Sequence, residues 1–71
     1  MINSDTYIKA YTWHGLKRYT AMVSGNAVGP ARTTILVAVS DAHIKGGKVD
    51  GVYDCDTGEY SKLMEYKEQR S

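Results

Sequence analysis

Two stretches near the N-terminus carry the residue pattern of β-strands. Residues 6–14, TYIKAYTWH, are dense in β-branched and aromatic residues and contain no breaker. Residues 17–24 alternate, with Tyr19, Ala21 and Val23 on one side and Met22 as the apolar exception on the other. Gly15 lies between the stretches and permits a tight reversal, so the chain is predicted to begin with a β-hairpin.

The longest apolar segment, residues 30–47, has two interpretations. Its many β-branched residues favour a strand. Its end signals favour a helix, because Pro30 suits the first helical position and a basic residue followed by Gly46 and Gly47 suits the last turn. A helical projection also gathers most apolar side chains on one stripe and the polar ones opposite. We therefore predict one helix over residues 30–45. The residues expected to pack on the sheet are Ile35, Leu36, Val39 and Ala42.

The C-terminal third is predicted as a second pair of strands, residues 48–54 and 59–66, around an acidic turn. In that turn Asp54 can accept a backbone hydrogen bond in an Asx turn, and Gly58 can take a positive φ. The element order is then β-β-α-β-β. This order predicts an α+β fold, a small antiparallel sheet of about four strands with one helix packed on it. If the central segment is a strand, an all-β five-stranded meander or barrel is the alternative.

The length of 71 residues predicts a single domain over residues 1–71, with residues 1–5 and 67–71 as loose ends. No apolar run approaches the roughly 18 residues of a membrane-spanning helix. The N-terminus lacks the basic and apolar regions of a signal peptide, and the one cysteine cannot form an internal disulfide, so a cytoplasmic protein is expected. A chain this short buries little apolar surface, which is compatible with a homo-oligomer.

Charge is distributed unevenly, although the net charge is only +1. Residues 1–49 contain six Lys and Arg and two Asp, whereas residues 50–71 contain six acidic and three basic residues. This division can give the folded molecule a basic and an acidic side, or can cancel where strands from the two parts lie side by side.

No motif predicts a metal, a cofactor or catalysis. His14, His43 and Cys55 are scattered and lack the spacing of a zinc site. The acidic turn has Gly58 and Glu59 where a calcium loop needs an oxygen ligand and a glycine. The loop SGNAVGP lacks the Gly-Lys-Ser/Thr ending of a phosphate loop. Nothing marks the Cys55 thiol as activated. We therefore expect no cofactor and no enzymatic activity.

The aromatic residues give the only indication of function, since the chain has six tyrosines, one tryptophan and no phenylalanine. Tyrosine and tryptophan are common at recognition surfaces, although in a chain without phenylalanine they can also fill the core. The first hairpin combines them with basic residues. The residues predicted to bind a partner are Tyr11, Trp13, Lys17, Arg18 and Tyr19. An acidic patch of Asp54, Asp56 and Glu59 is the alternative surface.

Small proteins without catalytic motifs commonly act by binding, among them phage-encoded inhibitors of host machinery. We therefore predict a protein-binding module, an inhibitor or a regulatory accessory protein, with another protein as its partner. The alternative is a nucleic-acid-binding accessory protein that uses the basic, aromatic hairpin. The near-neutral net charge argues against this alternative, because phosphate contacts need a basic surface.

Overall fold

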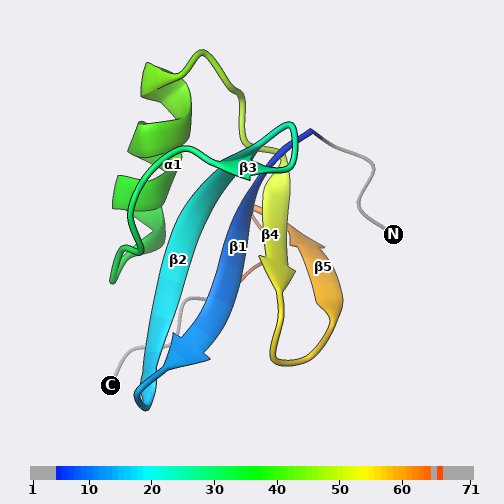
Figure 1. Ribbon diagram of the computed structural model, residues 1–71. Coiled ribbons are helices and arrows are strands. Elements are labelled where there is room, and N and C mark those ends of the chain that lie inside the picture. Colours follow the sequence, from blue (N-terminus) through cyan, green and yellow to red (C-terminus); the bar gives the residue numbers. More distant parts are fainter. Residues whose placement is uncertain (1–4, 65, 67–71) are drawn as a thin grey trace.

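The computed structural model describes residues 5–64 and residue 66, which form one helix and a five-stranded sheet (Figure 1). The strands follow the order β3-β2-β1-β4-β5, and the sheet is open. The predicted α+β class is confirmed, and the all-β alternative is wrong. The elements are β1 Thr6–Trp13, β2 Leu16–Val23, β3 Asn26–Ala27, α1 Ile35–Ile44, β4 Gly51–Asp54 and β5 Glu59–Lys62.

The sheet is mixed, not wholly antiparallel as predicted. The chain crosses one face of the sheet through α1 and returns on the far side of β1, where β4 runs parallel to β1 with Ile8 opposite Val52. The Asp50 amide donates to the Thr6 carbonyl, at 3.3 Å, where this pairing begins. β1 therefore lies at the centre of the sheet, with β2 antiparallel on one side and β4 parallel on the other.

Two tight turns give the N-terminal strands their register. His14 and Gly15 have φ of 51° and 78°, and Ser24 and Gly25 have φ of 52° and 81°. Two successive residues with positive φ are typical of a type I′ turn, whose twist matches that of paired strands. The first turn closes the predicted hairpin. The second turn adds β3, a two-residue strand in a segment that was predicted to be a loop.

The helix begins at Ile35, five residues later than predicted. The segment before it stays extended because it pairs with the edge of β2. The Tyr19 amide donates to the Arg32 carbonyl at 2.8 Å, and the Arg32 amide donates to the Tyr19 carbonyl at 2.7 Å. Pro30 therefore lies before this bridge and not in a first helical turn. The predicted end is confirmed, because Gly46 follows the helix with φ of 79° in the position of a C′ glycine.

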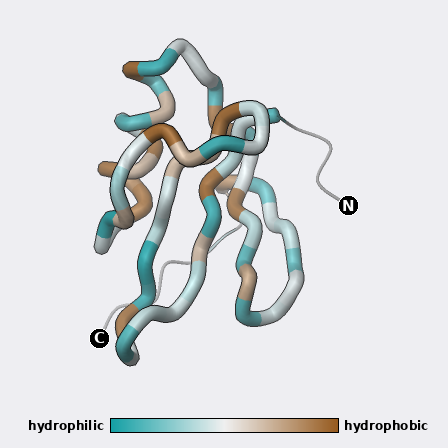
Figure 2. Tube along the Cα trace, in the orientation of Figure 1, coloured by the Kyte–Doolittle hydropathy of each residue, from teal (hydrophilic) through white to brown (hydrophobic). Residues whose placement is uncertain are grey.

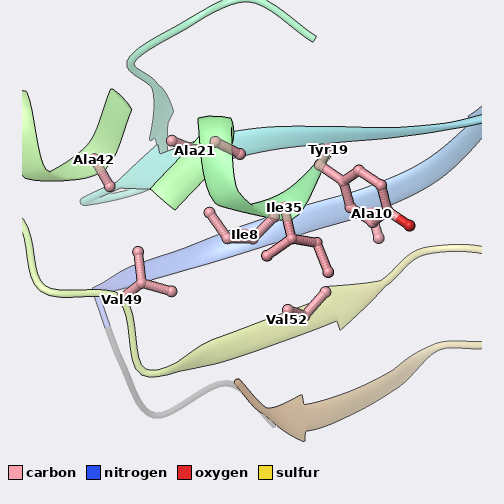
Figure 3. Close-up of a cluster of buried hydrophobic side chains, with 9 residues drawn as sticks. Ile8, Ala10, Tyr19, Ala21, Ile35, Ala42, Val49 and Val52 are labelled. Carbon is pink, nitrogen blue, oxygen red and sulfur yellow. The ribbon is translucent and has the colours of Figure 1, made fainter. Parts of the chain in front are cut away.

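The core lies between α1 and the sheet, where the labelled side chains of Figure 3 point toward one another. Four of its members are alanines, and their small side chains let the helix lie close to the strands. Val28, Val39, Leu63 and Tyr66 pack around its margin. The buried members are Ile8, Ala10, Tyr19, Ala21, Ile35, Ala38, Ala42, Val49 and Val52.

The helix packs through Ile35, Ala38 and Ala42, so the prediction for Ile35 and Ala42 is confirmed. The prediction for Leu36 is wrong, because 81% of this residue is exposed. Figure 2 shows apolar residues at several points around α1, so the apolar stripe is broad. The side of the helix that carries Ala38 and Ala42 packs on the sheet. Leu36 lies about 100° around the helix from Ile35 and therefore faces solvent.

We predict that Ile35→Ala lowers the free energy of unfolding by about 2–4 kcal/mol, because it leaves a cavity in the core. The matched change Leu36→Ala should alter it by no more than about 0.5 kcal/mol. Urea unfolding followed by circular dichroism measures both values. Similar losses for the two variants would contradict the helix orientation.

Candidate functional site

The strand register assigns every strand residue to one of two faces of the sheet. Ile8 lies opposite Ala21 on β2 and Val52 on β4, and all three side chains are in the core beneath α1. Successive residues of a strand point to opposite faces, so Tyr7 and Lys9 lie on the face away from the helix. We call this second face the open face.

Aromatic and basic side chains dominate the open face. Trp13 is 59% exposed at the end of β1, and the four tyrosines of this face are partly exposed. Leu16, Thr20 and Met22 of β2 complete the surface around them. The aromatic residues are Tyr7, Tyr11, Trp13, Tyr53 and Tyr60, and the basic residues are Lys9, Arg18 and Lys62.

Contacts within the open face hold several of these side chains in place. The Lys9 ammonium lies 5.8 Å from the centroid of the Tyr11 ring, a cation–π distance. The Tyr11 hydroxyl lies 3.4 Å from Thr20 Oγ1. The Trp13 ring meets His14 edge to face, with centroids 4.8 Å apart. These rings are therefore presented by a rigid strand and its turn, not by a long loop.

The second pair of tyrosines is built on β4 and β5. Tyr53 pairs directly with Tyr60 across these strands and lies beside Lys9 across β1 and β4. Gly51 makes room for Tyr60, because a Cβ atom at Gly51 would lie 2.6 Å from the Tyr60 hydroxyl oxygen. Desolvation in this packed position, with a smaller contribution from nearby Asp50, raises the pKa of Tyr60.

No strand residue on the open face is acidic, within the part of the chain that the structure describes. Asp5 and Asp50 lie directly before β1 and β4. Both lie at the end of the sheet where those strands begin. Tyr11, Trp13 and Arg18 lie toward the opposite end, beside the β1–β2 turn. At that end the carboxylates of Asp54, Asp56 and Glu59 lie on the opposite side of the sheet, where Lys17 pairs with two of them.

The opposite face carries an ion-paired cluster at the same end of the sheet. The Lys17 ammonium lies 2.9 Å from Asp54 Oδ2 and 2.8 Å from Asp56 Oδ2. The Thr12 hydroxyl donates to Asp56 at 2.6 Å, and the Tyr66 hydroxyl donates to Asp54 at 3.3 Å. The Lys17 and Asp54 side chains are only 13% and 14% exposed, so the cluster ties the ends of the two hairpins together.

The charges in this cluster stabilise one another against burial. Desolvation disfavours the charged form of Lys17, but hydrogen bonds to Asp56 and Asp54 outweigh it and raise the pKa of Lys17 above its usual value. Desolvation likewise opposes ionisation of Asp54, but the hydrogen bonds from Lys17 and from the Asp56 amide hold its pKa below the usual value. Hydrogen bonds from Lys17 and Thr12 lower the pKa of Asp56.

A second ion pair joins the helix to the segment before it. Arg32 Nε lies 2.8 Å from Asp41 Oδ2, and the hydrogen bonds from Arg32 lower the pKa of Asp41. Asp41 also packs against Gly29, where a Cβ atom would lie 2.7 Å from Asp41 Oδ2. Three carboxylates of the described chain are thus engaged by Lys17 and Arg32, while Lys9, Arg18 and Lys62 lie on the other face.

The residues predicted from the sequence as a single site divide between the two faces. Tyr11, Trp13 and Arg18 lie together on the open face. Tyr19 is 1% exposed in the core, and its ring meets that of Tyr66 edge to face at 6.4 Å. Lys17 forms ion pairs with Asp54 and Asp56, two residues of the acidic patch that was predicted as the alternative binding surface. The third acidic residue, Glu59, is exposed opposite Asp54.

The sequence-based prediction missed five residues of the open face. Tyr7 and Lys9 could have been found, because they share the odd positions of β1 with Tyr11 and Trp13. Tyr53, Tyr60 and Lys62 join the same face only through the pairing of β4 beside β1, which no local sequence signal predicts.

The described residues contain no group of three His, Cys, Asp or Glu side chains that could hold a metal ion. The same residues include no helix with the length and apolar character needed to cross a membrane. Comparisons with protein families, curated proteins and solved structures found no match.

We predict that Lys17→Met lowers the free energy of unfolding on the order of 1–2 kcal/mol at neutral pH, between the values for exposed and buried pairs. The folded-state pKa values of Asp54 and Asp56 are lowered, so their stabilisation is present above about pH 4 and lost as pH falls through those values. The raised pKa of Lys17 keeps this residue charged throughout that range. The stability difference between the wild type and the variant should therefore shrink on acidification.

Urea unfolding between about pH 7 and pH 2 measures this difference. A difference that stays constant over the whole range would contradict the assignment of Asp54 and Asp56 as the partners of Lys17.

Cys55 is exposed in the β4–β5 turn. Its backbone amide donates to the Ala10 carbonyl at 2.8 Å and helps to hold the turn against β1, together with the Thr12–Asp56 hydrogen bond. We predict that Cys55→Ser changes the free energy of unfolding by less than about 0.5 kcal/mol, because the substitution keeps this amide. Thermal unfolding under reducing conditions tests this, and a large destabilisation would assign the thiol a structural role.

Proposed function

We propose that this protein is a nucleic-acid-binding accessory protein and that it binds through the open face of its sheet. The observation that carries the proposal is the joint occurrence of aromatic and basic side chains on one face, with the strand carboxylates on the other. Lys and Arg side chains supply phosphate contacts, which dominate affinity for nucleic acid. Aromatic side chains supply surfaces on which bases stack.

The net charge of +1 does not oppose this proposal, because a ligand responds to the charge of the surface that it contacts and not to the net charge of the whole chain. Lys17 pairs with Asp54 and Asp56, and Arg32 pairs with Asp41, so these two cations are offset by three carboxylates on the helix side of the sheet. The remaining basic side chains of the strands are on the open face, away from these carboxylates. The local field over the open face is therefore more positive than the net charge indicates.

A protein partner is the second candidate, and one observation favours it. Trp13 and Leu16 pair directly at the tip of the first hairpin and are 59% and 53% exposed. An exposed aromatic residue beside an aliphatic one is a common anchor in protein interfaces. In this candidate function the protein is an inhibitor or a regulatory accessory protein. Binding would then depend on Trp13 and Leu16 and little on salt.

We predict that the protein binds a fluorescein-labelled oligonucleotide with an affinity that falls steeply between about 50 and 200 mM salt. Lys9→Gln and Arg18→Gln should each weaken binding and reduce the slope of log K against log salt by about 1, because each removes one phosphate contact. Fluorescence anisotropy measures both quantities, with the single strand and its duplex tested separately.

The matched control is Lys45→Gln, which removes an exposed charge at the end of α1, on the helix side of the sheet. It should leave the salt slope of the wild type unchanged. Failure to bind either oligonucleotide at low salt would overturn the proposed function. An equal effect of Lys45→Gln would overturn the assignment of the open face.

A further inference from the structure

We infer that the ligand of the open face is single-stranded nucleic acid, with bases stacked on Tyr11 and Trp13. The inference rests on the proposed function and specifies the form of nucleic acid that the site fits. It is drawn from three features of the open face: the kind of side chain, the arrangement of rings beside cations, and the position of the carboxylates.

The first feature is the chemistry of the open face. A duplex offers its base edges in grooves, and proteins read them with an inserted helix or β-ribbon that carries hydrogen-bonding side chains. The open face is instead part of a five-stranded sheet, on which Trp13 is exposed and four tyrosines are partly exposed. Ring faces complement base faces, which are available only where bases are unstacked from a duplex.

The second feature is the alternation of rings and cations across the strands. Tyr53 of β4 lies beside Lys9 of β1, and Tyr11 of β1 lies opposite Arg18 of β2. Lys9 also lies 5.8 Å from the centroid of the Tyr11 ring. Each such pair places a ring that can stack on a base beside a cation that can contact a phosphate, so each adjacent ring and cation can accept one nucleotide.

The third feature is the position of Asp5 and Asp50, because the carboxylates at the opposite end of the sheet, Asp54, Asp56 and Glu59, lie on its helix side. Asp5 and Asp50 lie where β1 and β4 begin, and they would repel a phosphate there. The single-stranded nucleic acid should therefore lie toward the β1–β2 turn, over Tyr11 and Trp13. Tyr53 and Lys9 lie farther from that turn. The His14 ring lies edge to face against the Trp13 ring, beside the turn.

Trp13 is the only tryptophan of the chain, so its fluorescence reports directly on this part of the face. The experiment titrates the full-length protein with oligo-dT, oligo-U and a blunt duplex of matched length. We expect saturable quenching of Trp13 by the single strands, with at least about tenfold tighter binding than to the duplex. Binding of oligo-dT or of oligo-U supports the inference.

Variants then test the stacking residues by anisotropy, which does not need the tryptophan signal. Tyr11→Leu and Trp13→Leu should each weaken single-strand binding about tenfold or more, whereas Trp13→Phe should retain most of the affinity. Leu36→Ala is the matched control, because it truncates an exposed apolar side chain on the helix side of the molecule. Circular dichroism checks that each variant is folded.

The outcomes separate the two levels of the proposal. Duplex binding as tight as single-strand binding, without quenching of Trp13, would overturn the single-strand inference and leave nucleic-acid binding in place. Absence of binding to all three probes would overturn both. Single-strand binding that Trp13→Leu and Leu36→Ala weaken equally would overturn the stacking role of Trp13.

Discussion

β1 pairs with β2 along one edge and with β4 along the other, so the alternation of its side chains fixes the faces of all three strands. One set, which includes Ile8 and Ala10, is committed to the core, and the other set must then face away from the helix. A shift of one residue in either pairing would exchange the two sets and bring Lys9 into the core. The aromatic and basic composition of the open face therefore follows from the register that buries the core.

The covered face is held by two kinds of contact. Two buried alanines of α1, Ala38 and Ala42, and two of the sheet, Ala10 and Ala21, allow close packing of helix on sheet. Beyond the helix, Lys17 lies between the carboxylates of Asp54 and Asp56 and joins the ends of the two hairpins. Such partly buried pairs add little net stability compared with apolar packing, but they disfavour any arrangement that separates them. Here they also keep two carboxylates away from the face that carries Arg18.

The sequence was informative wherever a local signal decides the structure. Gly15 and Gly58 marked turns, both with positive φ in the structure, and Gly46 marked the helix end. The predicted Asx turn is formed, since the Asp56 amide donates to Asp54 Oδ1 at 2.9 Å. Non-local pairing was not predictable in this way. The parallel partner of β1 and the extended pairing of Arg32 with Tyr19 depend on segments far apart in the chain.

The candidate site shows the same division. Lys17, Arg18 and Tyr19 are consecutive in a predicted strand, so they could not all lie on one face, and the structure separates Arg18 from its neighbours. The prediction grouped these three residues because they are neighbours in sequence. The alternation of side chains along paired strands instead places Arg18 on the same face as Tyr11 and Trp13. The tyrosines divide accordingly: Tyr19 fills the core that phenylalanine would fill elsewhere, and Tyr11 remains at the surface.

The two outer edges of the sheet differ, which limits how the sheet can be extended. On the β2 side, β3 has only two residues and Pro30 follows closely, so this edge offers a poor template for a further strand. On the other side, β5 has four residues and pairs only with β4 in the described chain. A strand from another molecule would therefore add at β5. If two copies paired through β5, each would be left with only its β3 edge, which is a poor template. The product would then be a closed pair and not a growing fibre.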